Sequence, residues 1–340
     1  MMPMIATPLA APLATPLATP PATPPAMPLA TPRPALRPAP RLLGLRPPRD
    51  PRAYQIAVLA GLLGWGLFGL RFDLHAPQVI VTIGAALVTQ LMCTRIARLP
   101  AFDPRSALIS GLSLCLLLRT DHLALAALAA AIAIASKFAL RVDGKHVFNP
   151  TNFGITVLLA LGSPVWVSPG QWGSVAFFAF LMACLGGLVV TRAARGDVTL
   201  AFLGAYAAIL FARAAWLGQR VAIPLHQLES GALLLFAFFM ISDPKTTPRA
   251  RRGRVLFAAL VACGAAAVQL LMYRTNGLLW SLVAFSPLVP LIDRLLPGPR
   301  YEWSRPVATQ PQPHPGEFDE TLPLPWRAVP DHGALARTRA

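Results

Sequence analysis

Charged side chains are scarce in this sequence, and the scarcity excludes most soluble proteins. Asp, Glu, Lys and Arg make up 13% of the 340 residues, whereas hydrophobic residues make up 55%. Soluble domains carry about 25% charged residues, so the composition predicts a polytopic membrane protein. No Asp, Glu or Lys lies well inside an apolar run of the sequence. A self-contained proton pump usually needs such groups, so a subunit that relies on partners, or a channel-like conductor, is favoured.

Cysteine is also rare, and no pattern of catalytic residues stands out. The four cysteines lie singly in four separate apolar runs, without a C-x-x-C pair or a Cys/His cluster. A metal site or a disulfide framework is therefore not expected. No nucleophile–base pair and no phosphate-binding loop is evident either. The sequence does not favour a hydrolytic enzyme.

Positive charge is plentiful, but its distribution argues against a nucleic-acid partner. The formal net charge is +16, and the basic residues fall between the apolar runs. If the N-terminus is inside, 25 of the 30 Lys and Arg residues lie on the inner side. The remaining five lie outside: Arg71, Arg119, Arg213, Arg220 and Arg274. The positive-inside rule therefore predicts a multi-pass protein of the cell inner membrane with both termini cytosolic.

Three regions follow from the distribution of proline and of apolar residues. Residues 1–53 are rich in Pro and Ala and repeat Ala-Thr-Pro-Leu units. Such a segment can neither continue a helix nor form a core, so a disordered cytosolic tail is predicted. It also lacks the features of a secretory signal. Residues 54–296 form the predicted transmembrane domain, and residues 297–340 form a second Pro-rich tail.

Ten apolar runs predict about ten transmembrane helices in an all-α fold. The third, fifth and eighth runs are short and carry Gly, Ser or Pro, which predicts half-helices that line protein. The runs are 54–72, 78–94, 106–118, 122–136, 153–167, 174–191, 199–215, 228–242, 255–273 and 277–295.

The two halves of this domain resemble each other in sequence. Thr151-Asn152-Phe153-Gly154 matches Thr275-Asn276-Gly277 after one residue is dropped, and Ser110-Gly111 matches Ser230-Gly231. These matches pair run 5 with run 10 and run 3 with run 8. An offset of five reverses direction, so two inverted five-helix repeats are predicted, with a site near their interface. Chance similarity between apolar segments is the alternative.

Two short motifs stand at the ends of apolar runs. Asn149-Pro150 has the residue types of a helix N-cap and first helical position. The start of that helix would offer free N–H groups to an anion, with Lys145 and His146 beside it. A plain helix cap is the simpler interpretation. For Asp243-Pro244 the simpler interpretation is a helix stop followed by a turn.

Three stretches carry a resemblance to a known family. They are Lys145 to Gly154 (KHVFNPTNFG), Ser106 to Leu112 (SALISGL) and Phe239 to Thr247 (FMISDPKTT). Together they resemble the NqrB/RnfD family of membrane subunits, over about residues 106–294. The sequence from Trp166 to Ser174 resembles a stand-alone branch of this family, UnbU, more than a standard respiratory subunit. That branch is found with enediyne biosynthesis.

The resemblance implies a ten-helix inverted-repeat fold, and it implies FMN esterified to a Thr on the outer side. The matching loop here, 162–173, contains no Thr, and the attachment point would fall near Ser174. We therefore expect FMN or riboflavin to be held non-covalently, if flavin is bound. The predicted cofactor-binding residues are Lys145, His146, Asn149, Asn152, Ser174, Asp243, Lys245 and Thr246.

Two functions remain open at this point. The first is a flavin-binding electron-transport subunit that is coupled to ion transport and acts in the lipid bilayer with other membrane redox subunits. The second is a transporter or channel on the same scaffold that serves a biosynthetic pathway without redox work. The missing Thr favours the second function, whereas the resemblance of the loops favours the first.

Overall fold

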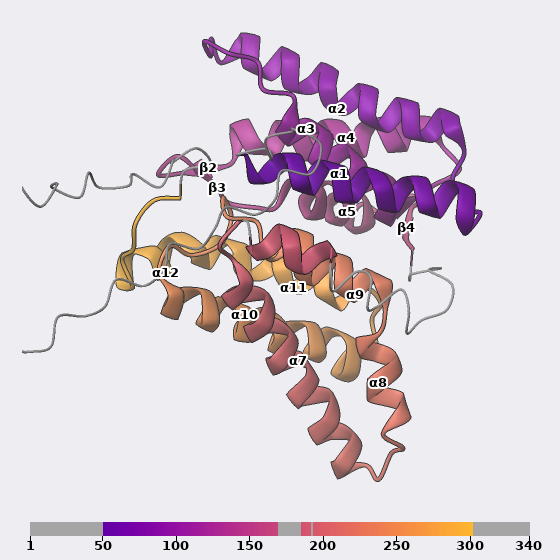
Figure 1. The fold of residues 1–340 in the computed structure, drawn as a ribbon, viewed down its shortest axis with the longest axis vertical. Helices are drawn as coiled ribbons and strands as arrows, with labels where there is room; N and C mark the ends of the chain where they lie inside the picture. The colour runs from indigo at the N-terminus through magenta and orange to yellow at the C-terminus, as the bar shows by residue number, and fades with distance from the viewer. Residues whose placement is uncertain (1–49, 169–184, 192, 302–340) are drawn as a thin grey trace, which may run out of the picture. The chain divides into compact units, whose positions relative to one another are not determined.

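The computed structural model describes residues 50–168, 185–191 and 193–301, and they are mostly helical (Figure 1). The predicted tails lie almost wholly outside the described residues, as does Ser174. Asp50 is the N-cap of the first helix, which begins at Pro51. This helix therefore begins three residues before the predicted start of the transmembrane domain, residue 54.

The first half of the described chain contains five helices. In α1 the Asp50 carboxylate accepts a hydrogen bond from the Arg52 N–H, and proline occupies the first helical position, which suits a helix start. A π-helical turn, η2 (Trp65–Gly69), continues α1. The helices are α1 (Pro51–Gly64), α2 (Ala76–Ile96), α3 (Arg105–Leu117), α4 (Leu123–Ala139) and α5 (Pro150–Ala160).

The described part of the second half includes helical residues 185–191, which precede α7 (Gly196–Trp216), and it contains further π-helical turns. The rest of the sixth predicted run, residues 174–184, lies outside the described residues. The segment η3 (Phe236–Met240) continues α9, and η4 (Ala267–Leu271) continues α10. The other helices are α8 (Ala222–Leu228), α9 (Gly231–Leu235), α10 (Arg251–Ala266), α11 (Gly277–Phe285), the 3₁₀ turn η5 (Ser286–Leu288) and α12 (Val289–Leu295).

Four helical segments are long and apolar enough to cross a membrane. They are Ala76–Ile96, Gly196–Trp216, Arg251–Leu271 and Gly277–Leu295. A fifth span is possible if α8 and the 231–240 segment, which are bent by 48°, form one broken span. These features confirm an all-α membrane protein. Among the described residues, four or five helical segments are long and apolar enough to span a membrane, not ten.

The short third, fifth and eighth runs form short helices, as predicted. Helix α3 has 13 residues and α5 has 11, while α9 and η3 together cover residues 231–240. The fifth run was expected to be helical as far as Val167, and this is wrong. Helix α5 ends at Ala160, and Gly162 adopts a left-handed φ of 65°. Ser163-Pro164 follows, and a residue before proline disfavours helical geometry.

The helices pack in a similar order within each half. Helix α2 packs along α4, and α7 packs along α10; α5 then contacts α4 as α11 contacts α10 (Figure 1). In both halves a glycine lets the two helices of the latter contact, α5 with α4 and α11 with α10, approach closely. A Cβ built on Gly154 would lie 2.6 Å from the Ala129 carbonyl oxygen, and one on Gly277 would lie 2.6 Å from that of Ala265. Helices α5 and α11 also contact each other.

Two pairs of two-residue strands, which the sequence did not predict, complete the described fold. Strands β1 (Leu118–Arg119) and β4 (Trp166–Val167) are antiparallel, with Leu118 opposite Val167. Strands β2 (Arg141–Val142) and β3 (Lys145–His146) form a hairpin. Its two turn residues, Asp143 and Gly144, both have positive φ, as a type I′ turn requires.

Candidate functional site

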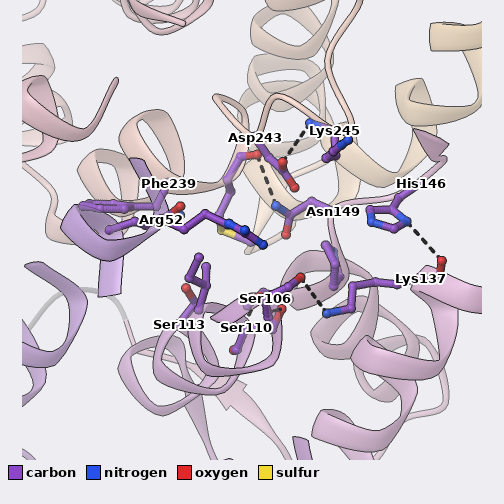
Figure 2. A pocket seen from close by; sticks show the side chains of 15 residues that line it. Arg52, Ser106, Ser110, Ser113, Lys137, His146, Asn149, Phe239, Asp243 and Lys245 are labelled. Atoms are coloured by element: carbon purple, nitrogen blue, oxygen red, sulfur yellow. Dashed lines mark hydrogen bonds between the residues drawn. The ribbon is translucent and has the colours of Figure 1, made fainter. Parts of the chain in front are cut away.

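A polar cavity of about 260 Å³ lies where α1, α3, α4, α5 and the end of η3 meet (Figure 2). Both halves of the chain supply its walls. The lining residues are Arg52, Gln55, Ser106, Ile109, Ser110, Ser113, Lys137, His146, Asn149, Pro150, Thr151, Phe239, Met240, Asp243 and Lys245.

Three hydroxyl groups of α3 face this cavity. Ser106, Ser110 and Ser113 are spaced by four and three residues, which places them on one face of a helix. The Ser110 hydroxyl donates to the Ser106 carbonyl oxygen at 3.1 Å. The remaining capacity of these hydroxyls gives the cavity a row of hydrogen-bonding groups in a helix that is otherwise apolar.

Lys137 brings a positive charge to the cavity from the last turn of α4. The sequence placed this lysine in a loop, and that is wrong: α4 extends to Ala139, and the Lys137 side chain is only 4% exposed. Its ammonium group donates to the Ser106 hydroxyl at 2.9 Å (Figure 2). Buried ammonium groups are costly unless they are hydrogen-bonded, so this contact fixes the position of the charge.

Asn149 anchors the start of α5 at the cavity wall. Its side-chain oxygen accepts from the Asn152 N–H at 3.1 Å, which confirms the predicted N-cap. Its amide group donates to the Met240 carbonyl oxygen at 3.3 Å, at the end of η3 (Figure 2). One side chain therefore caps α5 and ties it to the other half of the chain.

Asp243 forms the turn that follows η3, on the opposite wall. Its carboxylate accepts from the Lys245 N–H at 2.9 Å, and its carbonyl oxygen accepts from the Thr246 and Thr247 hydroxyls. Burial raises the pKa of Asp243, although the Lys245 N–H and the charge of Lys137 oppose the shift. The motif thus is a helix stop and turn, and its carboxyl group lines the cavity.

His146 and Lys145 lie next to each other in β3 but meet different surroundings. The His146 Nδ1–H donates to the Lys137 carbonyl oxygen at 3.0 Å, and the ring lines the cavity (Figure 2). Burial, helped by the charges of Lys137 and Arg141, lowers the pKa of His146 to about 4. His146 is therefore neutral at pH 7, and its Nε2 is an acceptor.

The ammonium group of Lys145 points away from this cavity. It donates to the Thr247 carbonyl oxygen at 2.6 Å and to the Asp293 carboxylate at 2.8 Å. Burial lowers the pKa of Lys145, while its ion pair with Asp293 raises it. Lys145 thus joins the β2–β3 hairpin to α12 and does not line the cavity.

The remaining predicted site residues also lie outside the cavity lining. Asn152 is fully buried, and its amide group donates to the Leu279 carbonyl oxygen in α11 at 3.1 Å. Thr246 is buried in the turn after Asp243. Ser174 lies outside the described residues. The structure therefore gathers His146, Asn149, Asp243 and Lys245 at the cavity, and it places Lys145, Asn152 and Thr246 around them.

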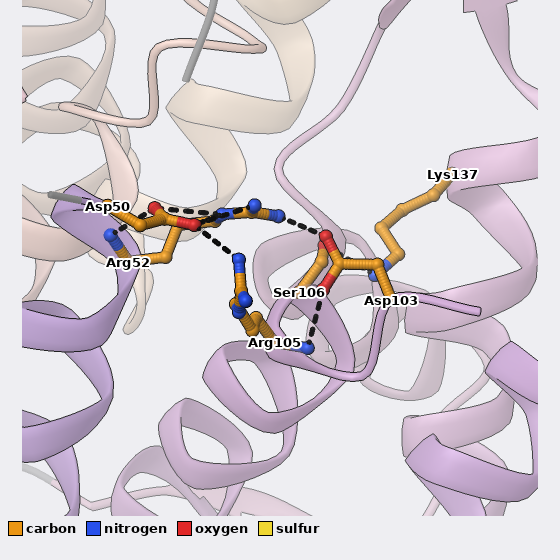
Figure 3. Close-up of polar contacts among 6 residues, drawn as sticks. All are labelled: Asp50, Arg52, Asp103, Arg105, Ser106 and Lys137. Atoms are coloured by element: carbon orange, nitrogen blue, oxygen red, sulfur yellow. Dashed lines mark hydrogen bonds and ion pairs between the residues drawn. The ribbon is translucent and has the colours of Figure 1, made fainter. Parts of the chain in front are cut away.

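An ion-pair network closes the side of the cavity near α1 (Figure 3). The Arg52 guanidinium, which lines the cavity, pairs with Asp50 at 2.8 Å and with Asp103. Arg105 pairs with the same Asp50 carboxylate at 2.7 Å. These contacts join the first turn of α1 to the loop that precedes α3, beside Ser106 and Lys137.

A second, larger hollow of about 760 Å³ lies at the start of the 231–240 segment, whose end lines the polar cavity. Its walls include β4, the start of α9 and the start of α11. The Tyr206 hydroxyl donates to the Gln269 side-chain oxygen at 2.7 Å within it. Arg274, which the charge count placed outside, also lines it. The two hollows therefore lie at opposite ends of the 231–240 segment.

Sequence reasoning missed Arg52, Lys137 and the serines of α3. The serines could have been found, because their spacing places them on one helix face. The Asp-Gly pair could have indicated the hairpin that separates His146 from Lys145. Arg52 gave no such signal, because it lies at the edge of the Pro-rich segment.

Comparisons with known proteins give the same family that the motifs suggested, and the family-model match includes the 239–247 motif. Residues 164–301 match the model of a family described as NQR2, RnfD, RnfE family. The chain is 23% identical over 290 residues to the D component of the proton-translocating ferredoxin:NAD(+) oxidoreductase complex of Clostridium ljungdahlii. That match covers 70% of this chain and 88% of the relative.

Two further relatives match over shorter stretches. Both are named as the D component of an ion-translocating oxidoreductase complex. The chain is 32% identical over 174 residues to that of Shewanella amazonensis, covering 47% of this chain and 48% of the relative. It is 32% identical over 127 residues to that of Erwinia tasmaniensis, covering 36% and 34%. The chain thus spans about a third to a half of these two relatives.

Proposed function

Because the chain belongs to the NQR2, RnfD, RnfE family, we propose that it is a membrane subunit of a multi-subunit electron-transport complex that moves ions. The relatives' names support this role, since each is a component of an oxidoreductase complex that translocates ions or protons. The proposed location is the cell inner membrane, with both termini cytosolic and other membrane redox subunits as partners.

The observation that carries the proposal is the polar cavity between the two halves. Its walls bring three cationic side chains, Arg52, Lys137 and Lys245, together with Asp243. Polar and ionisable groups inside membrane domains are costly, and they usually mark substrate, ion or cofactor sites. Purely structural packing would have no use for a hydrophilic hollow of this kind.

The donor set of this cavity fits a flavin. Ser110, Ser113 and Lys137 would hydrogen-bond the polar edge of a ring system, and Phe239 would pack against its apolar part. The volume of about 260 Å³ is close to the lower end of small-molecule sites, which is about 300 Å³. A bound flavin supplies one- and two-electron transfer. The residues of the chain would bind and orient the ring, and the helices would surround it.

We propose that any flavin in this protein is FMN or riboflavin held non-covalently. The loop over residues 162–173 contains no Thr, and Ser174 is the hydroxyl closest to the expected attachment point. Serine could form the same phosphoester, so the proposal rests on the missing Thr motif and not on the chemistry of the hydroxyl.

We also propose ten membrane helices in two inverted repeats. The matching contacts of Gly154 with Ala129 and of Gly277 with Ala265 support this relation. The Thr-Asn pair lies inside the first turn of α5, whereas Thr275 and Asn276 stand directly before α11. The halves differ after the motif as well, because α5 ends at Ala160, before Ser163-Pro164, whereas Ser286-Pro287 lies in η5, which leads into α12.

The alternative is a transporter or channel on the same scaffold without redox work. The missing Thr favours it, and so does the resemblance of residues 166–174 to the UnbU branch. Under this alternative the cavity would hold a transported solute instead of a flavin. The genes that neighbour this one would separate the two functions, since redox subunits accompany the first and a natural-product cluster the second.

Absorbance of the purified full-length protein tests the proposal. We expect a flavin spectrum between 350 and about 500 nm that is lost to the filtrate after denaturation, because non-covalent flavin is released. Lys137→Gln should lower the retained flavin about tenfold, since a charged hydrogen bond is worth about 1.5–3 kcal/mol. Arg141→Gln is the matched control, because Arg141 is exposed, lies in β2 four residues after Lys137 and does not line the cavity.

The possible outcomes separate the proposals. Flavin that stays with the denatured chain, and that Ser174→Ala abolishes, would contradict non-covalent binding. Protein that lacks flavin and does not take up added FMN or riboflavin would contradict the redox function and support the transporter.

A further inference from the structure

A small hollow of about 220 Å³, separate from the polar cavity, is lined mainly by basic side chains. Four segments form it: the β2–β3 hairpin, the residue before α7, the turn before α10 and the chain that follows α12. Its charged and aromatic lining includes Lys145, Arg195, Lys245, Arg249, Arg300 and Tyr301. We call it the basic hollow.

Positive charge exceeds negative charge in this hollow. Five cationic side chains line it, against Asp143 in the lining and Asp293 behind it. Asp293 serves two of the cations, because its carboxylate pairs with the Lys145 ammonium at 2.8 Å and lies 3.6 Å from the Arg249 Nε. The group therefore carries an excess of positive charge, which is unfavourable at close range unless an anion binds.

Arg195 gives the second observation. Its side chain is buried, with 6% of its surface exposed, and it stacks on the Tyr301 ring at 4.7 Å from the ring centre. Its Nε–H has no hydrogen-bond partner among the described residues, although one terminal nitrogen donates to the Ala194 carbonyl oxygen. Leaving such a buried donor unsatisfied costs about 1–3 kcal/mol, so an acceptor is expected within reach.

We propose that the basic hollow binds a phosphate group. Guanidinium groups match phosphate oxygens with paired N–H donors, and a lysine adds a point charge. The hollow is large enough for a phosphate and its immediate substituents but too small for a folded peptide segment. The inference is independent of the flavin proposal, because Lys245 is the one described residue in the linings of both the basic hollow and the polar cavity.

The position of the basic hollow bears on which molecule carries the phosphate. Its residues belong to the loops that the charge distribution places on the cytosolic side, close to the ends of α7, α10 and α12. Basic pockets between membrane helices on that side bind the head groups of anionic lipids. Soluble phosphate has the same chemistry, so the experiment has to distinguish the two sources.

The test uses the full chain, purified in a neutral detergent and stripped of lipid. Binding of radiolabelled inorganic phosphate is measured by equilibrium dialysis. Binding of a short-chain phosphatidylglycerol, with the corresponding phosphatidylcholine as the uncharged control, is measured by native mass spectrometry. The altered proteins are Arg195→Gln and Arg300→Gln. Arg300 is exposed, so its replacement should not impair folding.

The matched control is Arg252→Gln, because Arg252 is exposed and lies near Arg249 in the chain but does not line the hollow. We expect one saturable site per chain, about tenfold weaker in Arg195→Gln and in Arg300→Gln and unchanged in Arg252→Gln. Binding of phosphatidylglycerol alone supports a lipid head group, and binding of both probes supports phosphate from either source.

Two results would overturn the inference. One is the absence of saturable binding for both probes. The other is binding that Arg195→Gln and Arg300→Gln leave unchanged, which would place the anion elsewhere. Failure here is distinguishable from failure of the flavin proposal, because Arg300→Gln should leave the flavin content intact and Lys137→Gln should leave phosphate binding intact.

Discussion

At the scale of single residues, the β2–β3 hairpin decides what two neighbouring side chains do. Successive residues of a strand point to opposite sides. His146 therefore faces the polar cavity, while Lys145 reaches Asp293 and lines the basic hollow. Both residues were predicted to bind one ligand. The hairpin instead assigns them to two different sites.

His146 should make stability depend on pH. Its pKa is lowered from 6.5 to about 4 in the folded protein, so the unfolded chain takes up a proton first as the pH falls. The contribution is fully present above pH 6.5 and is lost between pH 6.5 and about 4. From pH 7.5 to pH 5 the loss should be roughly 2 kcal/mol, since one pKa unit corresponds to about 1.4 kcal/mol.

The measurement is the midpoint of thermal unfolding in detergent at the two pH values. His146→Asn is the control, because its amide can replace the Nδ1–H donor but does not titrate. The difference between the two proteins isolates His146 from Asp243, whose raised pKa also affects this range. Equal pH dependence in both proteins would contradict the prediction.

Residue types revealed part of the site and concealed the rest. Asn149 was predicted correctly as an N-cap, because the Asn-Pro pair has one strongly preferred local geometry. Lys137 was placed in a loop because a charge after an apolar run usually marks its end. The structure keeps it in α4, where Ser106 satisfies its ammonium group. That partner comes from another helix, so local sequence could not reveal it.

At the scale of elements, two glycines set the distance between helices. Gly154 brings α5 against the backbone of α4, and Gly277 brings α11 against that of α10. Close approach through small residues is a common way for helices to associate in lipid, where the hydrophobic effect does not drive them together. The start of α5, which carries Asn149, depends on this contact for its position.

Replacing either glycine should separate the paired helices. In Gly154→Ala and in Gly277→Ala the new methyl group would lie about 2.6 Å from a carbonyl oxygen, and overpacking typically costs about 1–3 kcal/mol. We expect each change to lower the midpoint of thermal unfolding. Heating the detergent-solubilised protein and measuring the monodisperse fraction would show this.

Gly204→Ala is the matched control for this experiment. Gly204 lies in the interior of α7, is exposed, and has no atom within 4 Å of a Cβ built on it. Alanine should be tolerated there or slightly stabilising. If all three substitutions lower stability equally, the close-packing interpretation is wrong.

Helix starts were more predictable than helix ends. The cap residue Asn149 stands directly before α5, as predicted, because capping depends on a few adjacent residues. The ends depend on tertiary packing. The π-helical turns η2, η3 and η4 were not predicted, since an insertion of this kind has no clear sequence signature.

At the scale of the whole molecule, the charge distribution predicts which loops share a side of the membrane. Single cysteines at positions 220 and 252, introduced after replacing the four native cysteines by alanine, should react with a membrane-impermeant thiol reagent from opposite sides. Arg220 and Arg252 are both exposed. Labelling of intact cells and of inverted vesicles measures this.

A pair of positions on one side serves as the control. Cysteines at positions 98 and 252 should both react only in inverted vesicles, because both loops are predicted to be cytosolic. Arg98 is exposed as well. Labelling of positions 220 and 252 from the same side would rule out the predicted alternation of loops.

The order in which the chain is made matters for one contact described above. Asn152 donates to the Leu279 carbonyl oxygen, 127 residues further along the chain. A ribosome adds about 5–20 residues per second, so α5 waits about 6–25 seconds for its partner after it is made. During that time the Asn152 amide has no α11 to bond. Insertion of the first half should therefore be reversible or chaperoned until translation reaches α11, and a nascent chain that stops before Gly277 should be a preferred target for membrane quality-control proteases.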